Sequence, residues 1–75
     1  MMGRRAWYTL GTIAEWIRLF MADNGYAPTG ADMAQAFGIS KSGARSYFMR
    51  LENAGYIQRG KGLRNLTVND ERIAA

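Results

Sequence analysis

The segment from Gly38 to Ile57 constrains the fold most, because it contains the local signals for a tight turn, a complete helix and the start of a strand. Gly38 has no Cβ and can take the left-handed conformation in which many helices end. Ser40 is a favourable N-cap for the next helix, and Gly55 is suited to terminate that helix. The segment therefore predicts a helix over residues 41–53, preceded by the end of another helix.

The predicted helix over residues 41–53 has two chemically different faces. Ala44, Phe48 and Leu51 recur with helical spacing and form its apolar, buried face. The opposite face carries small polar residues and a methionine between two arginines: Ser42, Ser46, Met49 and Asn53, with Arg45 and Arg50 beside them. A short helix of this kind suits the major groove of DNA, whose width admits one α-helix.

Two further helices are predicted upstream. Apolar residues fall on one helical stripe between residues 8 and 24; they are Leu10, Ile13, Ala14, Ile17, Phe20 and Met21. Thr29 and Asp32 have the spacing of a capping box, which predicts a second helix over residues 30–37. Residues 30–53 therefore have the order of a helix-turn-helix. A helix pair with this turn can also serve a purely structural role.

After Gly55 the periodicity changes from that of a helix to that of a strand. Residues 56–59 and 63–68 read as two strands, and the glycine-containing loop 60–62 predicts a β-hairpin. The hairpin carries three basic side chains, those of Arg59, Lys61 and Arg64. Glycine lets the backbone of such a loop approach phosphates closely. An ordinary solvated hairpin has the same sequence pattern.

The positive charge is concentrated in one third of the chain. The formal net charge is +4. Residues 41–64 contain six Lys and Arg residues against one Glu, whereas the rest of the chain contains four basic and five acidic residues. A localised basic patch is the electrostatic footprint of a polyanionic partner. The alternative is a solvated basic face without a partner.

The length and composition predict a single small domain over residues 1–75, with residues 1–6 as a loose basic tail and 69–75 as a C-terminal tail. The chain has no Cys and no His, so disulfides, thiolate metal sites and the commonest general base are excluded. We therefore expect neither an enzyme nor a metal, cofactor or small-molecule ligand. Glu15 and Arg18 interrupt the first apolar stretch, so we expect no signal peptide or membrane span and a cytoplasmic location.

Three stretches carry a family resemblance: IAEWIRLFMADNGYAPTGADMAQAFGIS, ARSYFMRLENAGYI and QRGKGLRNLTV. They cover residues 13–68 and resemble the N-terminal DNA-binding domain of the LexA repressor and, more loosely, MarR-like winged-helix regulators. The resemblance implies an α+β, mostly α fold, a winged helix-turn-helix with three helices and a C-terminal β-hairpin wing. It also implies a prokaryotic or phage transcriptional regulator or repressor that binds specific double-stranded DNA, with recognition helix 41–53 in the major groove and wing 59–64 on the backbone or minor groove.

By position, the resemblance implies nine residues that contact DNA. They are Lys41, Ser42, Arg45 and Ser46 at base edges or nearby phosphates, Arg50 on the phosphate side, Arg59, Lys61 and Arg64 in the wing, and Thr29 at a phosphate. Gly43 departs from the family pattern, because a side chain is usual there, and it removes one reader of bases. The self-cleaving peptidase domain of LexA has no counterpart in these 75 residues. Its protease function and main dimerisation surface are therefore not carried over.

Two alternatives remain open at the level of sequence. The winged helix can instead bind a protein, as a phage factor docking on a host protein would, with Trp16, Leu19 and Met49 as anchors. A homodimer on paired DNA half-sites would strengthen DNA binding, through the first helix or a terminal tail. Trp16 accordingly either covers the small core or forms a dimer contact together with Leu19.

Overall fold

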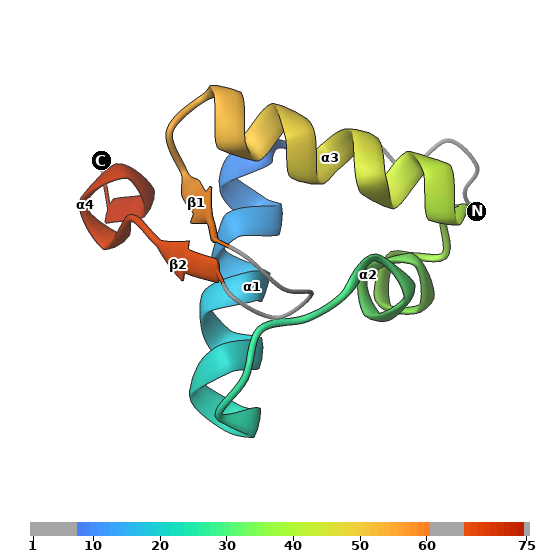
Figure 1. Ribbon diagram of the computed structural model, residues 1–75, viewed down its shortest axis with the longest axis horizontal. Helices are drawn as coiled ribbons and strands as arrows, with labels where there is room; N and C mark the ends of the chain where they lie inside the picture. Colours follow the sequence, from blue (N-terminus) through green and yellow to red (C-terminus); the bar gives the residue numbers. More distant parts are fainter. Residues whose placement is uncertain (1–7, 61–65, 75) are drawn as a thin grey trace.

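The computed structural model describes residues 8–60 and 66–74. Six elements follow one another along the chain: α1 (Leu10–Asn24), α2 (Gly30–Phe37), α3 (Lys41–Asn53), β1 (Ile57–Arg59), β2 (Leu66–Val68) and α4 (Asp70–Ala74). Three longer helices and one antiparallel hairpin form a winged helix, as Figure 1 shows. The predicted α+β, mostly α fold class is confirmed.

The predicted bounds of α2 and α3 are confirmed, and α1 begins two residues later than predicted. The prediction placed its start at Tyr8, whereas the helix begins at Leu10. The reason is a cap: the Thr9 hydroxyl oxygen accepts a hydrogen bond from the Thr12 amide at 3.1 Å, which holds Thr9 in an extended conformation. None of the described helices is long and apolar enough to cross a membrane.

The turn between α2 and α3 has the predicted chemistry. Gly38 has a φ of 66°, and the Ile39 amide behind it donates to the Ala34 carbonyl at 3.0 Å. Two residues later, the Ser40 hydroxyl accepts a hydrogen bond from the Gly43 amide at 3.0 Å and starts α3. This turn sets the direction in which α3 leaves α2 (Figure 1).

The end of α3 turns the chain directly into the hairpin. Gly55 has a φ of 86°, and the Tyr56 amide donates to the Leu51 carbonyl at 2.9 Å. This six-residue hydrogen bond is the Schellman type of helix termination. In the hairpin, Ile57 pairs with Val68 and Arg59 pairs with Leu66.

The first strand is shorter than predicted. β1 begins at Ile57 instead of Tyr56, because the Tyr56 amide is held by the end of α3. β2 begins at Leu66 among the described residues. Residues 63–65 of the predicted second strand lie outside the described part of the chain.

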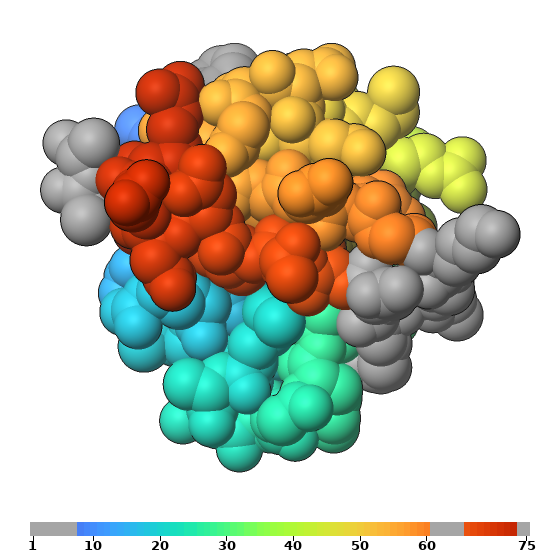
Figure 2. Space-filling view, turned by 60° about the vertical axis from the view of Figure 1, so that its left-hand side comes forward, coloured from blue at the N-terminus to red at the C-terminus, as the bar shows by residue number. Residues whose placement is uncertain are grey.

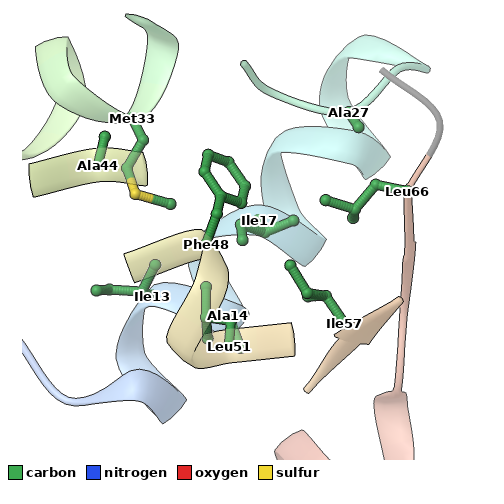
Figure 3. Packing of buried hydrophobic residues seen from close by; sticks show 10 residues of the cluster. All are labelled: Ile13, Ala14, Ile17, Ala27, Met33, Ala44, Phe48, Leu51, Ile57 and Leu66. Atoms are coloured by element: carbon green, nitrogen blue, oxygen red, sulfur yellow. The ribbon is translucent and has the colours of Figure 1, made fainter. Parts of the chain in front are cut away.

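The core forms where α1, α3 and the hairpin meet, with contributions from α2 and the chain after α1. Figure 3 shows the buried hydrophobic side chains of the core among the described residues: Ile13, Ala14, Ile17, Ala27, Met33, Ala44, Phe48, Leu51, Ile57 and Leu66. The predicted apolar face of α3 is therefore buried. Trp16 is half-buried and packs at 5.2 Å from Phe37 and 5.4 Å from Phe20, measured between ring centroids. This packing supports the interpretation that Trp16 covers the core.

A fourth helix occupies residues 70–74, which were predicted as part of a C-terminal tail, so that prediction is wrong for these residues. α4 follows β2 after one residue and packs against α1. Asp70 and Glu71 lie in its first turn, where their negative charges interact favourably with the positive end of the helix dipole. Five residues are too few for a recognisable apolar stripe, so tertiary packing accounts for this helix.

Candidate nucleic-acid interface

A groove of about 380 Å³ lies between the start of α2, the first half of α3 and the hairpin. Its lining comprises Pro28, Thr29, Gly30, Ala31, Lys41, Ser42, Arg45, Phe48, Arg59 and Leu66. Five predicted contact residues therefore meet on one surface: Thr29, Lys41, Ser42, Arg45 and Arg59. They come from three elements that are separated by up to thirty positions in the sequence.

The first turns of α3 form one wall of this groove. Lys41, Ser42 and Arg45 are exposed and lie within about one helical turn of each other, so their side chains extend from the same edge of α3. The adjoining face of α3 is fixed by its buried side chains Ala44, Phe48 and Leu51, of which Phe48 also lines the groove. The burial of one face therefore determines which side chains the other face presents.

Ser46 and Arg50 do not line the groove. Ser46 is half-buried, and Arg50 is exposed in the last turn of α3. The Arg50 guanidinium carbon lies 5.3 Å from the centroid of the Tyr47 ring, which places it against its own helix. The two residues thus continue the exposed side of α3 beyond the groove.

Arg59, at the end of β1, forms the wall opposite α3. Its guanidinium carbon lies 5.4 Å from the centroid of the Phe48 ring, within the range of a cation–π contact. The two other predicted wing residues, Lys61 and Arg64, lie outside the described residues. Of the three predicted wing residues, Arg59 is the one that the described part of the chain places at the groove.

Thr29 stands at the start of α2, where a capping box occupies most of its hydrogen-bonding groups. Its amide donates to the Asp32 carboxylate at 2.9 Å, and its hydroxyl oxygen accepts from the Asp32 amide at 3.3 Å. The predicted capping box is therefore confirmed. The Thr29 amide is already engaged, so a ligand contact at this position falls to the hydroxyl hydrogen.

Gly30 and Ala31 also line the groove, and they were not among the predicted contact residues. They are the first two residues of α2, where backbone N–H groups have no acceptor within the helix. Such N–H groups favour anions through hydrogen bonding and the helix dipole. The signal for them was the capping box itself, because it defines which residues begin the helix.

The charges of the described residues are arranged differently on α1 and in the groove. Among residues 8–60 and 66–74, the ion pair found joins Arg18 to Glu15 on α1, and the Arg18 guanidinium lowers the pKa of the Glu15 carboxyl by hydrogen bonding. The groove lining contains three cations and no carboxylate among those residues. The same part of the chain contains no cluster of acidic, His or Cys residues suited to a metal ion.

Comparison with known proteins gives the family of this chain. A family model described as the LexA DNA-binding domain matches residues 11–64, from the first turn of α1 to beyond β1. A LexA repressor from Pseudothermotoga lettingae is 36% identical over 56 residues, which cover 75% of this chain and 28% of that protein. The chain thus spans little more than a quarter of the length of this relative. The chain belongs to the LexA DNA-binding-domain family.

Proposed function

We propose that this chain is a transcriptional regulator that recognises specific double-stranded DNA with α3 and the hairpin. The observation that carries the proposal is the groove in which Lys41, Arg45 and Arg59 meet without a lining carboxylate among the described residues. Membership of a DNA-binding family supports the same partner. A binding role, and not catalysis, agrees with this family and with a chain that has no Cys and no His.

In the proposed complex, α3 enters the major groove. Lys41, Ser42 and Arg45 are exposed on one edge of its first turns and can reach base edges or the phosphates beside them. Arginine paired with guanine is the commonest specific contact in the major groove. Arg45 is therefore our first candidate for a residue that reads a base.

A second set of residues would contact the phosphate backbone of the DNA. Arg59 from the hairpin, Arg50 from the end of α3 and the Thr29 hydroxyl beside the amides of Gly30 and Ala31 would contact phosphates. Lys61 and Arg64 remain proposed wing contacts. Phosphate contacts of this kind supply much of the affinity and make it depend strongly on salt.

We further propose that two copies bind paired half-sites in the bacterial cytoplasm or in a phage-infected cell. A single domain of this size buries a small DNA interface, and a dimer on a palindromic site combines two such interfaces. The relative is named a repressor, and a repressor role is our proposal for this chain as well.

A second function, the binding of a protein partner, is favoured by a different observation. Leu19 and Tyr26, in and just after the last turns of α1, are 49% and 48% exposed. Both side chains are large enough to anchor an interface. Met49 is 55% exposed on α3, so it is accessible both to DNA and to a protein partner. Neither Leu19 nor Tyr26 lines the groove, so a partner bound at these residues would leave the groove accessible.

Selection from a randomised duplex pool, repeated at two salt concentrations, tests the proposed function. Enrichment of a palindromic motif would support a dimeric, sequence-specific regulator, and enrichment of one short motif would support a monomer. Salt-dependent binding without enrichment would instead indicate a non-specific role. Absence of binding at low salt would overturn the DNA proposal and favour the protein-binding alternative.

A matched pair of variants makes this experiment specific to the groove. Arg45→Ala and Arg18→Ala remove the same side chain from α3 and α1, respectively. Arg18 pairs with Glu15 and does not line the groove, so its loss changes the net charge equally but leaves the proposed interface intact. We expect the motif selected with Arg45→Ala to lose its preference at one position, while Arg18→Ala selects the same motif as the unmodified chain.

A further inference from the structure

Residues 69–74 lie at the base of the hairpin, where β1 begins and β2 ends, on the side away from α2 (Figure 1). We call Asn69, Arg72 and Ile73 the C-terminal clasp. In Figure 2, α4 lies over α1 and beside the start of the hairpin. These residues lie beyond the segment that the family model matches, so the match assigns them no role.

Asn69 joins three parts of the structure by hydrogen bonds. Its amide donates to the Tyr56 carbonyl at 2.8 Å, which extends the strand pairing by one residue. Its side-chain nitrogen donates to the Gly55 carbonyl at 3.2 Å, and its side-chain oxygen accepts from the Arg72 amide at 3.3 Å. One residue therefore caps α4 and ties it to the turn between α3 and β1.

The other two clasp residues hold α4 against the rest of the domain. The Arg72 guanidinium carbon lies 5.1 Å from the centroid of the Tyr56 ring. Ile73 packs against the hydrophobic core, and it lines a shallow hollow together with Glu15 and Arg18 of α1. α4 is thus anchored both to α1 and to the turn that begins the hairpin.

One face of the hairpin is fixed by Ile57 and Leu66, which are buried in the core, and its base is held by the clasp. Its strands have three described residues each, and an isolated two-stranded hairpin of this size is marginally stable in water. Asn69 directly follows Val68, whereas Leu66 at the other end of β2 pairs with Arg59 and lines the groove. The clasp and the groove therefore meet opposite ends of the same short strand.

We propose that Asn69 and Arg72 are positioning residues for DNA binding. They hold the hairpin at the angle at which Arg59 stays over the Phe48 ring and faces the groove. They act through Arg59 and do not touch DNA themselves. This inference rests on the proposed function, because it assigns the clasp a part in the same interface.

Two variants of the full chain weaken the clasp while they keep its other properties. Asn69→Ser keeps an N-cap hydroxyl for α4 but is too short to reach the Gly55 carbonyl. Arg72→Lys keeps the charge but loses the planar group that stacks on Tyr56. Asn24→Ser is the matched control, because Asn24 likewise donates to a carbonyl, that of Phe20 at 2.9 Å, far from the hairpin.

The first readout is independent of DNA. We expect the Phe48 ring to shift the NMR signals of the Arg59 side-chain methylene protons, because the guanidinium lies over that ring. We expect Asn69→Ser and Arg72→Lys to move these signals toward those of an unstructured arginine, while Asn24→Ser leaves them in place. Unchanged signals in both clasp variants would overturn the inference.

The second readout is affinity for a duplex recovered by selection, or for a mixed-sequence duplex, at a temperature where circular dichroism shows every variant folded. We expect Asn69→Ser to weaken binding about three- to tenfold. In a double-mutant cycle, Asn69→Ser should cause no further loss of affinity when Arg59→Ala is already present. It should cause the same loss when Arg45→Ala is already present. Asn24→Ser should bind like the unmodified chain.

The outcomes distinguish the inference from the function on which it rests. Equal losses in both backgrounds would indicate a general structural effect and would overturn the positioning role. Unchanged affinity of Asn69→Ser, with the unmodified chain binding DNA, would overturn this inference alone. Failure of the unmodified chain to bind any duplex would overturn the proposed function and, with it, the role of the clasp in DNA binding.

Discussion

The guanidinium carbon of Arg59 lies 5.4 Å from the centroid of the Phe48 ring, so the hairpin and α3 meet through one cation–π contact at the groove. Phe48 is 4% exposed, and its ring belongs to the core as well as to the groove lining. Because the ring is held by the core, it offers Arg59 a fixed surface. The core thereby orients a cation that stands outside it.

Arg59→Ala should weaken DNA binding nearly equally for all sequences, because we assign Arg59 to phosphate. The slope of the logarithm of affinity against the logarithm of salt concentration should fall by about one. Fluorescence anisotropy titrations with a selected and an unrelated duplex, at several salt concentrations, measure both effects. A loss confined to the selected duplex would make Arg59 a base-reading residue instead.

Arg45→Ala should relax the sequence preference at one base position. We expect a cost of about 1–3 kcal/mol on the preferred duplex and a smaller cost on duplexes altered at that position. Repeating the pool selection with the variant identifies which position loses its preference. Uniform weakening on every duplex would reassign Arg45 to a phosphate.

Thr29→Ala should destabilise the domain and also weaken DNA binding, because it removes both the α2 cap and the hydroxyl at the groove. Loss of such a cap costs about 0.5–2 kcal/mol of unfolding free energy. Thr29→Ser keeps the hydroxyl and serves as the control in urea denaturation and in binding. Full DNA affinity of the folded Thr29→Ala variant would remove Thr29 from the proposed interface.

Gly38→Ala should destabilise the domain, because Gly38 has a φ of 66°, a conformation that a residue with a Cβ adopts only at a cost. We expect a loss of about 1 kcal/mol in unfolding free energy. Gly30→Ala is the comparison variant, since a Cβ at Gly30 would meet no atom within 4 Å. Thermal or urea unfolding of the two variants gives the difference, and equal stabilities would contradict the role of the Gly38 turn.

The helices and their turn could be predicted from the sequence because their signals are local. The capping box of Thr29, the N-cap of Ser40 and the glycines after the helices each act within a few residues. The same is true of the buried face of α3, which follows from helical spacing alone. These features therefore depend little on where the rest of the chain lies.

The candidate site was predictable only in part. The sequence selected Thr29, Lys41, Ser42, Arg45 and Arg59, and the structure brings these residues to one groove. It did not select Gly30 and Ala31, because backbone groups give no compositional signal. The assignment of Ser46 and Arg50 to DNA remains a prediction, since the described groove does not include them.

The sequence by itself determined the order of the first five elements, the class of fold and the position of the basic residues, because caps, turns and hydrophobic periodicity act over short distances. Only the tertiary structure decided that Arg59 meets Phe48, that the groove has α2 as its third wall, and that residues 70–74 form a helix. Those features depend on packing between segments far apart in the chain. A five-residue helix such as α4 is stabilised by the surfaces it covers, and its own sequence cannot specify those surfaces.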